Sequence, residues 1–294
     1  MFGPDPNNSE VGSRLGAADR CTDTMELPAA LPLHAGSLLN FLAARAVPGV
    51  EEVAGTTYRR SVRLPHGPAV VALELAGGAA PAWRLERGDP SDAAAAAELC
   101  GTLVDAGADP VAIDGALAAD PLLEGLVASA PGRRVPGCAD PSEIAVRAVL
   151  GQQVSVAAAR TQASRLAERV GEPLPEPSGT VTRLFPEPAA LAELDPGTLP
   201  MPRARGRALT AMASALAGGL DPRDRGAFLE LTGIGPWTAD YVAMRCGEPD
   251  VLLETDLGVG RGFARLADPA GLARRAEAWR PWRSYAVQHL WSLA

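Results

Sequence analysis

Leu231-Thr-Gly-Ile-Gly-Pro-Trp-Thr-Ala-Asp-Tyr241 is a tight glycine turn that opens into a helix. Gly233 and Gly235 give the turn its backbone freedom, and Pro236 suits the first position of a helix. Because neither glycine has a side chain, backbone amides can approach a phosphate closely, and the helix N-terminus adds partial positive charge. The stretch predicts either a phosphate-binding hairpin or a plain helix–helix connection, since short Gly-x-Gly turns are common.

Asp256 follows the hairpin and stands shortly after an extended apolar stretch at 251–253. It precedes an apolar-periodic helix that contains Val259 and Phe263, so it is placed to cap that helix. The same position also suits a carboxylate directed toward a bound ligand. Local sequence alone favours the N-cap.

The fold class is predicted to be α+β. Residues 56–64 and 69–75 alternate in polarity on either side of a Pro/Gly turn, which predicts a β-hairpin in a small antiparallel sheet. We place this mixed α/β domain at 26–90. Residues 1–25 are rich in Gly, Pro, Asn, Asp and Ser, and we expect a flexible tail there.

From residue 91 to 294 the pattern is helical. Asp-Pro pairs at 140–141 and 268–269 are typical helix starts, because Asp caps the helix and Pro occupies its first turn. Residues 171–179 are predicted to be a Pro/Glu/Gly loop. We expect two helical lobes, with the helix-hairpin-helix at about 223–246.

Charge is unevenly distributed along the chain. The net charge is −8, but residues 1–130 hold 8 arginines and 17 acidic residues (−9), whereas residues 131–294 hold 19 arginines and 18 acidic residues (+1). The later arginines form either a local basic surface or a solvated, salt-bridged one. They include Arg203, Arg205, Arg207, Arg261, Arg265, Arg274, Arg275, Arg280 and Arg283.

All 27 basic residues are arginine, so no lysine side chain can form a Schiff base. The absence of lysine also removes the phosphate-binding lysine of Walker-type NTPases. The four cysteines, Cys21, Cys100, Cys138 and Cys246, are too far apart in sequence for zinc or iron–sulfur spacing, and we expect free, mostly buried thiols. With no signal-peptide pattern and no apolar run that could span a bilayer, we expect a cytoplasmic monomer without membrane contact.

Several motifs in order resemble the helix-hairpin-helix DNA glycosylases, and within them the bacterial DNA-3-methyladenine glycosylase II type. The resemblance runs from about residue 38 to the C-terminus. Besides the hairpin, its carriers are Asn40-Phe-Leu-Ala-Ala-Arg-Ala-Val47, Val135-Pro-Gly-Cys-Ala-Asp140, Arg147-Ala-Val-Leu-Gly-Gln-Gln-Val-Ser-Val156, Thr255-Asp256, Trp279-Arg-Pro-Trp-Arg-Ser-Tyr-Ala286 and His289-Leu-Trp291.

This resemblance implies a role for individual residues. Asp256 would be catalytic, stabilising positive charge on the sugar as a base departs. The base pocket would consist of Trp237, Tyr241, Trp291, Phe41 and Arg45, although core packing remains open for Phe41 and a salt bridge for Arg45. DNA would be bound by Gly233, Gly235, Thr238 and Gln153. No cofactor is required, but main-chain carbonyls of Leu229, Leu231 and Gly233 are implied to hold a structural Na⁺ or K⁺.

The implied activity is that of a monofunctional glycosylase. It would flip alkylated purines, such as 3-methyladenine and 7-methylguanine, out of duplex DNA, release them and leave an abasic site in base excision repair. Its location would be cytoplasmic, at the nucleoid through DNA. In bifunctional relatives a lysine occupies the position of Trp237, so a lysine-based lyase step is not expected.

Two positions depart from the family pattern. Leu257 follows the aspartate where the best-known bacterial relative has tyrosine, and Gln153 stands where that relative has an apolar residue that inserts between bases. Two alternatives stay open: a non-catalytic DNA-damage binding protein, and a glycosylase for another base, such as uracil or a deaminated purine.

Overall fold

A computed structural model describes residues 22–294. Most of the expected flexible tail, residues 1–21, lies outside the described residues. The rest of it pairs with the sheet, because the Thr22 amide donates to the Leu85 carbonyl at 3.1 Å and Met25 lies opposite Trp83.

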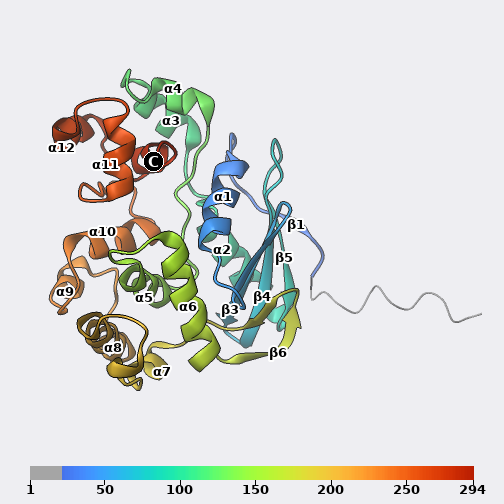
Figure 1. The fold of residues 1–294 in the computed structure, drawn as a ribbon. Helices are drawn as coiled ribbons and strands as arrows, with labels where there is room; N and C mark the ends of the chain where they lie inside the picture. The colour runs from blue at the N-terminus through green and yellow to red at the C-terminus, as the bar shows by residue number, and fades with distance from the viewer. Residues whose placement is uncertain (1–21) are drawn as a thin grey trace, which may run out of the picture.

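The N-terminal part is an antiparallel five-stranded sheet with the order β1-β5-β4-β3-β2. Its strands are β1 (Met25–Glu26), β2 (Glu51–Ala54), β3 (Thr57–Leu64), β4 (Gly67–Glu74) and β5 (Ala82–Arg87). Helices α1 (Ala35–Arg45) and α2 (Ala93–Leu103) cover the sheet on the side of the helical lobes, as Figure 1 shows. The apolar core of this part, which we expected to end near residue 90, continues through α2 to Val104.

The helices after α2 form two lobes with separate apolar cores (Figure 1). One lobe consists of α5 (Pro141–Gly151), α6 (Val156–Val170), α7 (Pro188–Ala192), α8 (Arg203–Ala217), α9 (Arg225–Leu229) and α10 (Pro236–Arg245). The other consists of α3 (Pro110–Ala118), α4 (Glu124–Ser129), α11 (Leu257–Ala264), α12 (Leu272–Ala276) and α13 (Arg283–Trp291). The second lobe is therefore built from two stretches far apart in the sequence. A sheet followed by helices confirms the predicted α+β class.

One predicted loop is in fact a small hairpin. Residues 171–179 were expected to lack regular structure, but β6 (Pro173–Ser178) pairs antiparallel with β7 (Val181–Arg183). Leu174 and Val181 are buried together with Val70 of the main sheet. The prolines of β6 cannot donate to a ladder, which is tolerated in an edge strand of this kind.

Both predicted Asp-Pro starts are capped by their aspartate, but they lead into different elements. Asp140 caps α5 through the Ser142 amide, and Pro141 occupies the first turn. Asp268 begins a single 3-10 turn (Pro269–Gly271) that leads directly into α12, where a longer helix start was expected. Across residues 22–294, no helix has the length and apolar character needed to cross a membrane.

Candidate active site

The two glycines of the hairpin between α9 and α10 differ in their surroundings. Gly233 has φ +89°, a conformation that favours glycine, and a Cβ there would lie 2.6 Å from the Cβ of Ala208. Gly235 is extended, and a Cβ there would meet no atom within 4 Å, so this side is open. Among the described residues, none accepts a hydrogen bond from the amides of Gly235 and Trp237. Free amides at an open helix N-terminus suit an anion.

Asp256 is both a helix cap and a carboxylate held by two indoles. Its Oδ1 accepts hydrogen bonds from the Val259 amide at 2.9 Å and from Trp291 Nε1 at 2.8 Å. Its Oδ2 accepts one from Trp237 Nε1 at 3.0 Å. Helices α10, α11 and α13 thus each supply one donor. The two interpretations of Asp256 are compatible, because a half-buried carboxylate has acceptor positions beyond the one that caps α11.

A groove of about 1570 Å³ runs along this carboxylate between the sheet side and the two lobes. It brings together every residue expected in catalysis, the base pocket and DNA contact. These are Phe41, Arg45, Gln153, Gly233, Gly235, Trp237, Thr238, Tyr241, Asp256 and Trp291. Leu257 also lines the groove and is 74% exposed, so the wall beside Asp256 is an aliphatic side chain open to solvent.

Four aromatic rings lie next to one another along the groove. Trp237 and Tyr241 are stacked, with ring centroids 5.4 Å apart and planes at 10°, so each ring covers one face of the other. Trp291 stands between Tyr241 at 6.5 Å and Phe41 at 6.2 Å. Phe41 is partly exposed and lines the groove.

Two arginines lie against the Phe41 ring: Arg45, which lines the groove, and Arg245, which is buried. The Arg45 Cζ lies 3.8 Å from the centroid of Phe41, and the Arg245 Cζ lies 4.9 Å from the same ring. In the described part of the chain neither has a carboxylate within salt-bridge distance. Arg245 donates to the Tyr241 hydroxyl at 3.0 Å. Burial alone would raise the pKa of Tyr241, but the cations of Arg245, Arg45 and Arg147 outweigh it and lower that pKa.

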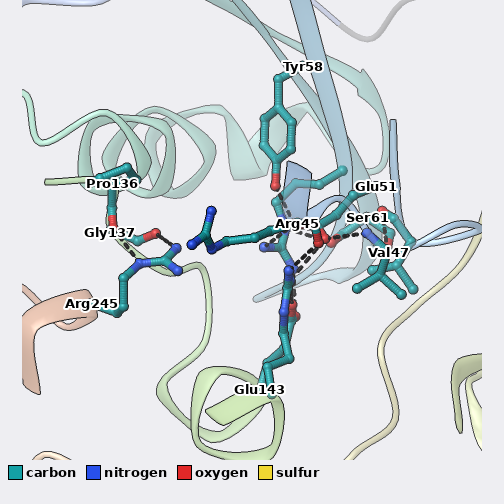
Figure 2. A network of polar contacts seen from close by, with 12 residues as sticks. Arg45, Val47, Glu51, Tyr58, Ser61, Pro136, Gly137, Glu143 and Arg245 are labelled. Atoms are coloured by element: carbon teal, nitrogen blue, oxygen red, sulfur yellow. Dashed lines mark hydrogen bonds and ion pairs between the residues drawn. The ribbon is translucent and has the colours of Figure 1, made fainter. Parts of the chain in front are cut away.

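A buried network of charged side chains joins the N-terminal sheet to α5 (Figure 2). Arg147 Nη1 lies 2.9 Å from Glu51 Oε2 and 2.8 Å from Glu143 Oε1, while Arg60 Nη2 lies 2.6 Å from Glu143 Oε2. Burial would raise the pKa of Glu51, but the two arginines outweigh it and lower that pKa. Arg147 Nη2 also donates to the Arg45 carbonyl at 2.6 Å, which anchors the end of α1 at the groove.

The turn between α5 and α6 carries both glutamines of the sequence motif. Gln153 is exposed, lines the groove and has φ +55°, which is rare for a residue with a side chain. Gln152, to which the sequence motif assigned no role of its own, donates from Nε2 to the Gly233 carbonyl and to Thr238 Oγ1, both at 3.0 Å. The turn is thereby bound to the hairpin.

The surface arginines divide into paired and unpaired groups. Arg275 pairs with Asp120, and Arg280 and Arg283 both pair with Asp250, as a salt-bridged surface would. Six further surface arginines have no ion pair in the described part of the chain: Arg203, Arg205, Arg207, Arg261, Arg265 and Arg274. Of these six, Arg261 lines the groove.

Sequence reasoning missed the residues that support this site. Arg245, Glu51 and Glu143 were not singled out, because their partners are distant in the sequence and no local pattern marks them. Cys138 and Cys246, judged far apart, bring their sulfur atoms to 3.7 Å. Among residues 22–294, no cluster of His, Cys, Asp and Glu could hold a metal ion.

Comparison with known proteins places this geometry in a family. The AlkA N-terminal domain family matches residues 24–140. The chain is 38% identical to DNA-3-methyladenine glycosylase 2 of Escherichia coli over 267 residues, covering 86% of this chain and 92% of that protein. It is 44% identical over 283 residues to the probable bifunctional transcriptional activator/DNA repair enzyme AlkA of Mycobacterium tuberculosis. That match covers 92% of this chain but 57% of the mycobacterial protein, so the chain spans little more than half of that relative's length.

Among solved structures, the 3-methyladenine DNA-glycosylase of Archaeoglobus fulgidus matches with a TM-score of 0.76 at 18% identity, covering 92% of this chain and 97% of that one. This likeness shows that the fold is shared. The identity to the E. coli protein over nearly its whole length shows the family. The chain belongs to the AlkA family of bacterial helix-hairpin-helix glycosylases, the DNA-3-methyladenine glycosylase 2 type.

Proposed function

We propose that this protein is a monofunctional DNA glycosylase that removes alkylated purines from duplex DNA and leaves an abasic site. The observation that supports it most is the carboxylate of Asp256, which lies in an aromatic groove with Trp237 donating to one oxygen and Trp291 to the other. Both indole donors restrict its rotation, so the charge is held in a fixed direction. Family membership points to the same activity.

In the proposed reaction the carboxylate acts electrostatically. As the bond between sugar and base lengthens, positive charge develops on the sugar, and the oriented anion of Asp256 stabilises it. The same carboxylate can position the attacking water. Alkylated purines such as 7-methylguanine already carry positive charge and are good leaving groups, so no second acid is needed beside the base. The groove accordingly needs only one carboxylate.

Binding of the duplex is assigned to the hairpin and to the α5–α6 turn. The free amides beside Gly235 would bind a backbone phosphate, whereas Thr238 in the same first turn of α10 is only 2% exposed and holds the Gln152 side chain instead. A base that leaves the stack leaves a gap in the duplex. The exposed Gln153 would fill this gap and hydrogen-bond the base that has lost its partner. Unpaired Arg261 on the groove wall would add a further phosphate contact.

Strand cleavage after base removal is not part of the proposed activity. A lyase step of the lysine type needs an amine in the hairpin helix, and the chain has no lysine at all. Trp237 occupies that place and donates its indole proton to Asp256 instead. Borohydride treatment of the enzyme with abasic DNA is therefore expected to trap no covalent complex through a lysine.

We assign a monovalent cation to the hairpin carbonyls, as the family resemblance implies. The carbonyl of Leu231 accepts the Ile234 amide and that of Gly233 accepts Gln152, each at 3.0 Å, so each oxygen keeps a second acceptor position. Leu229 would supply the third neutral oxygen, and such oxygens suit Na⁺ or K⁺. When bound, the cation would add positive charge behind the phosphate-binding amides.

One observation supports a second candidate substrate. The guanidinium of Arg45 has no carboxylate partner and lies against Phe41 inside the groove. A cation at this place repels a positively charged base, but it can donate a hydrogen bond to a neutral one. A deaminated purine offers a carbonyl oxygen at its edge as an acceptor. This observation favours neutral deaminated purines as additional substrates.

A panel of duplexes tests both candidates. Purified protein is incubated with duplexes that each carry one 7-methylguanine, one hypoxanthine or one uracil, and with dimethyl-sulfate-treated DNA, and released bases are separated by chromatography. We expect release of methylated purines and an intact strand until alkali is added. Tight binding of the lesions without release would instead identify a non-catalytic damage-binding protein.

A further inference from the structure

The side chain of Gln152 connects two parts of the site that are distant in the sequence. Its Nε2 lies 3.0 Å from the Gly233 carbonyl and 3.0 Å from Thr238 Oγ1, residues that follow it by 81 and 86 positions. Both partners belong to the hairpin and the first turn of α10. Gln152 itself ends α5, and its own amide bonds to the Val149 carbonyl at 3.2 Å.

The chemistry of the partners fixes which end of the amide faces the hairpin. A main-chain carbonyl only accepts, so the group next to Gly233 must be the NH₂ of Gln152 rather than its oxygen. The two N–H bonds of that group then serve Gly233 and Thr238. A side chain of similar length without donors would lose both contacts.

The neighbouring Gln153 is held in an uncommon backbone conformation. Its φ of +55° costs energy for a residue with a Cβ and persists only where the surroundings impose it. On one side the turn ends α5, and on the other Ser155 caps α6 through the Ala158 amide. The third restraint on the turn is the bridge from Gln152 to the hairpin.

We propose that Gln152 is a positioning residue, which sets the distance between the exposed Gln153 and the phosphate-binding hairpin. The hairpin binds the DNA backbone, and Gln153 enters the gap left by the flipped base. Both must therefore contact the same duplex at the same time. In this proposal Gln152 acts through its bonds to Gly233 and Thr238 and not through contact with the sugar or the base. This proposal rests on the proposed function, because a gap exists only when a base is flipped.

The test compares Gln152→Met with Gln162→Met. The substitution is the same in both, but Gln162 lies on α6 and its side chain has no hydrogen bond within the described residues, so the control removes none. Single-turnover release of 7-methylguanine at saturating enzyme and the Kd for undamaged duplex are measured. We expect Gln152→Met to release base about tenfold more slowly than the control, with a Kd changed by less than about threefold, because misplacing a group by about 1 Å costs up to about 100-fold.

A double-mutant cycle separates positioning from general weakening. In a Gln153→Ala background, Gln152→Met should slow release by less than about threefold, because the group that it positions is already gone. The proposal is overturned if Gln152→Met releases base at the rate of Gln162→Met, or if the losses from Gln152→Met and Gln153→Ala simply multiply.

A third readout works without base release. A duplex with a tetrahydrofuran abasic analogue and 2-aminopurine on the opposite strand reports contact at the gap through its fluorescence. We expect Gln152→Met to reduce the fluorescence change given by the unaltered protein, and an undiminished change would count against positioning. If the unaltered protein released no base at all, the proposed function would fail while this readout still tested Gln152.

Discussion

Replacing Glu51 by Gln should destabilise the protein strongly, because it removes one of two anions from a buried, balanced set of four charges. Glu51 is 6% exposed and accepts hydrogen bonds from the Val47 amide at 2.7 Å, Tyr58 at 2.6 Å and Arg147 at 2.9 Å. Gln retains the shape, but Arg60 and Arg147 would then share only one carboxylate. Breaking a buried pair of this kind costs about 3–5 kcal/mol.

For a domain of this size each kcal/mol shifts the melting temperature by roughly 2–4 °C, so we expect a decrease of about 6–20 °C in differential scanning calorimetry. The double variant Glu51→Gln/Arg147→Met is the control, since it removes one charge of each sign and should recover part of the loss. A decrease below about 2 °C for Glu51→Gln would show that the network does not depend on this charge, as would a double variant less stable than the single one.

The same network predicts a pH dependence. The pKa of Glu51 is lower in the folded protein than in the unfolded chain, since Arg147 and Arg60 outweigh the effect of burial. Its contribution to stability is therefore present above the ordinary glutamate pKa and is lost as the pH falls through the lower, folded value. Glu51→Gln should accordingly lose less stability than the unaltered protein on acidification below about pH 4.5.

Three further outcomes follow from the site. Trp291→Phe keeps a ring but removes the 2.8 Å hydrogen bond to Asp256. Single-turnover base release should slow about tenfold, which equals the loss of about 1.4 kcal/mol. An unchanged rate would show that the indole N–H is dispensable. Arg45→Met removes a cation 5.8 Å from the Trp291 ring. It should raise the release of 7-methylguanine relative to hypoxanthine by about 5–30-fold, because the partly screened repulsion between this cation and a positively charged base is worth about 1–2 kcal/mol. An unchanged ratio of the two released bases, measured by chromatography, would contradict this expectation. In native protein at pH 8, iodoacetamide should modify Cys138 well before Cys100. The hydrogen bond from the neighbouring thiol lowers the pKa of Cys138, whereas burial raises the pKa of Cys100 to about 12. Equal labelling of the two cysteines in peptide mass spectra would argue against these environments.

The sequence predicted those parts of the fold that depend on local pattern. Alternation in β3 and β4 and the Asp-Pro helix start at 140–141 identified the sheet and the beginning of α5, because both signals lie within a few residues. The joining of α3 and α4 to the C-terminal helices has no local signal, since their shared core forms only in the folded chain. The hairpin at β6 was missed because its prolines conceal the buried Leu174.

The site shows a similar division. Local sequence favoured Asp256 as a helix cap, which it is, and only the family resemblance suggested its role as a catalytic carboxylate. Its contacts with Trp237 and Trp291 join three helices and could not be derived from spacing. Arg45 was expected either to border the groove or to pair with an acid, and it borders the groove against an aromatic ring. The two bonds of Gln152 likewise depend on tertiary contact.

Asp256 is proposed to drive base release, and Asp256→Asn removes its charge while keeping the size of the side chain. The measurement is single-turnover release of 7-methylguanine, with Asp268→Asn as the matched control, because Asp268 is also an N-cap but is exposed on another turn and does not line the groove. We expect Asp256→Asn to lose release by about 100-fold or more while it still binds tetrahydrofuran-containing duplex, and Asp268→Asn to keep the rate of the unaltered protein. Release by Asp256→Asn at the rate of the Asp268→Asn control would contradict the assigned role.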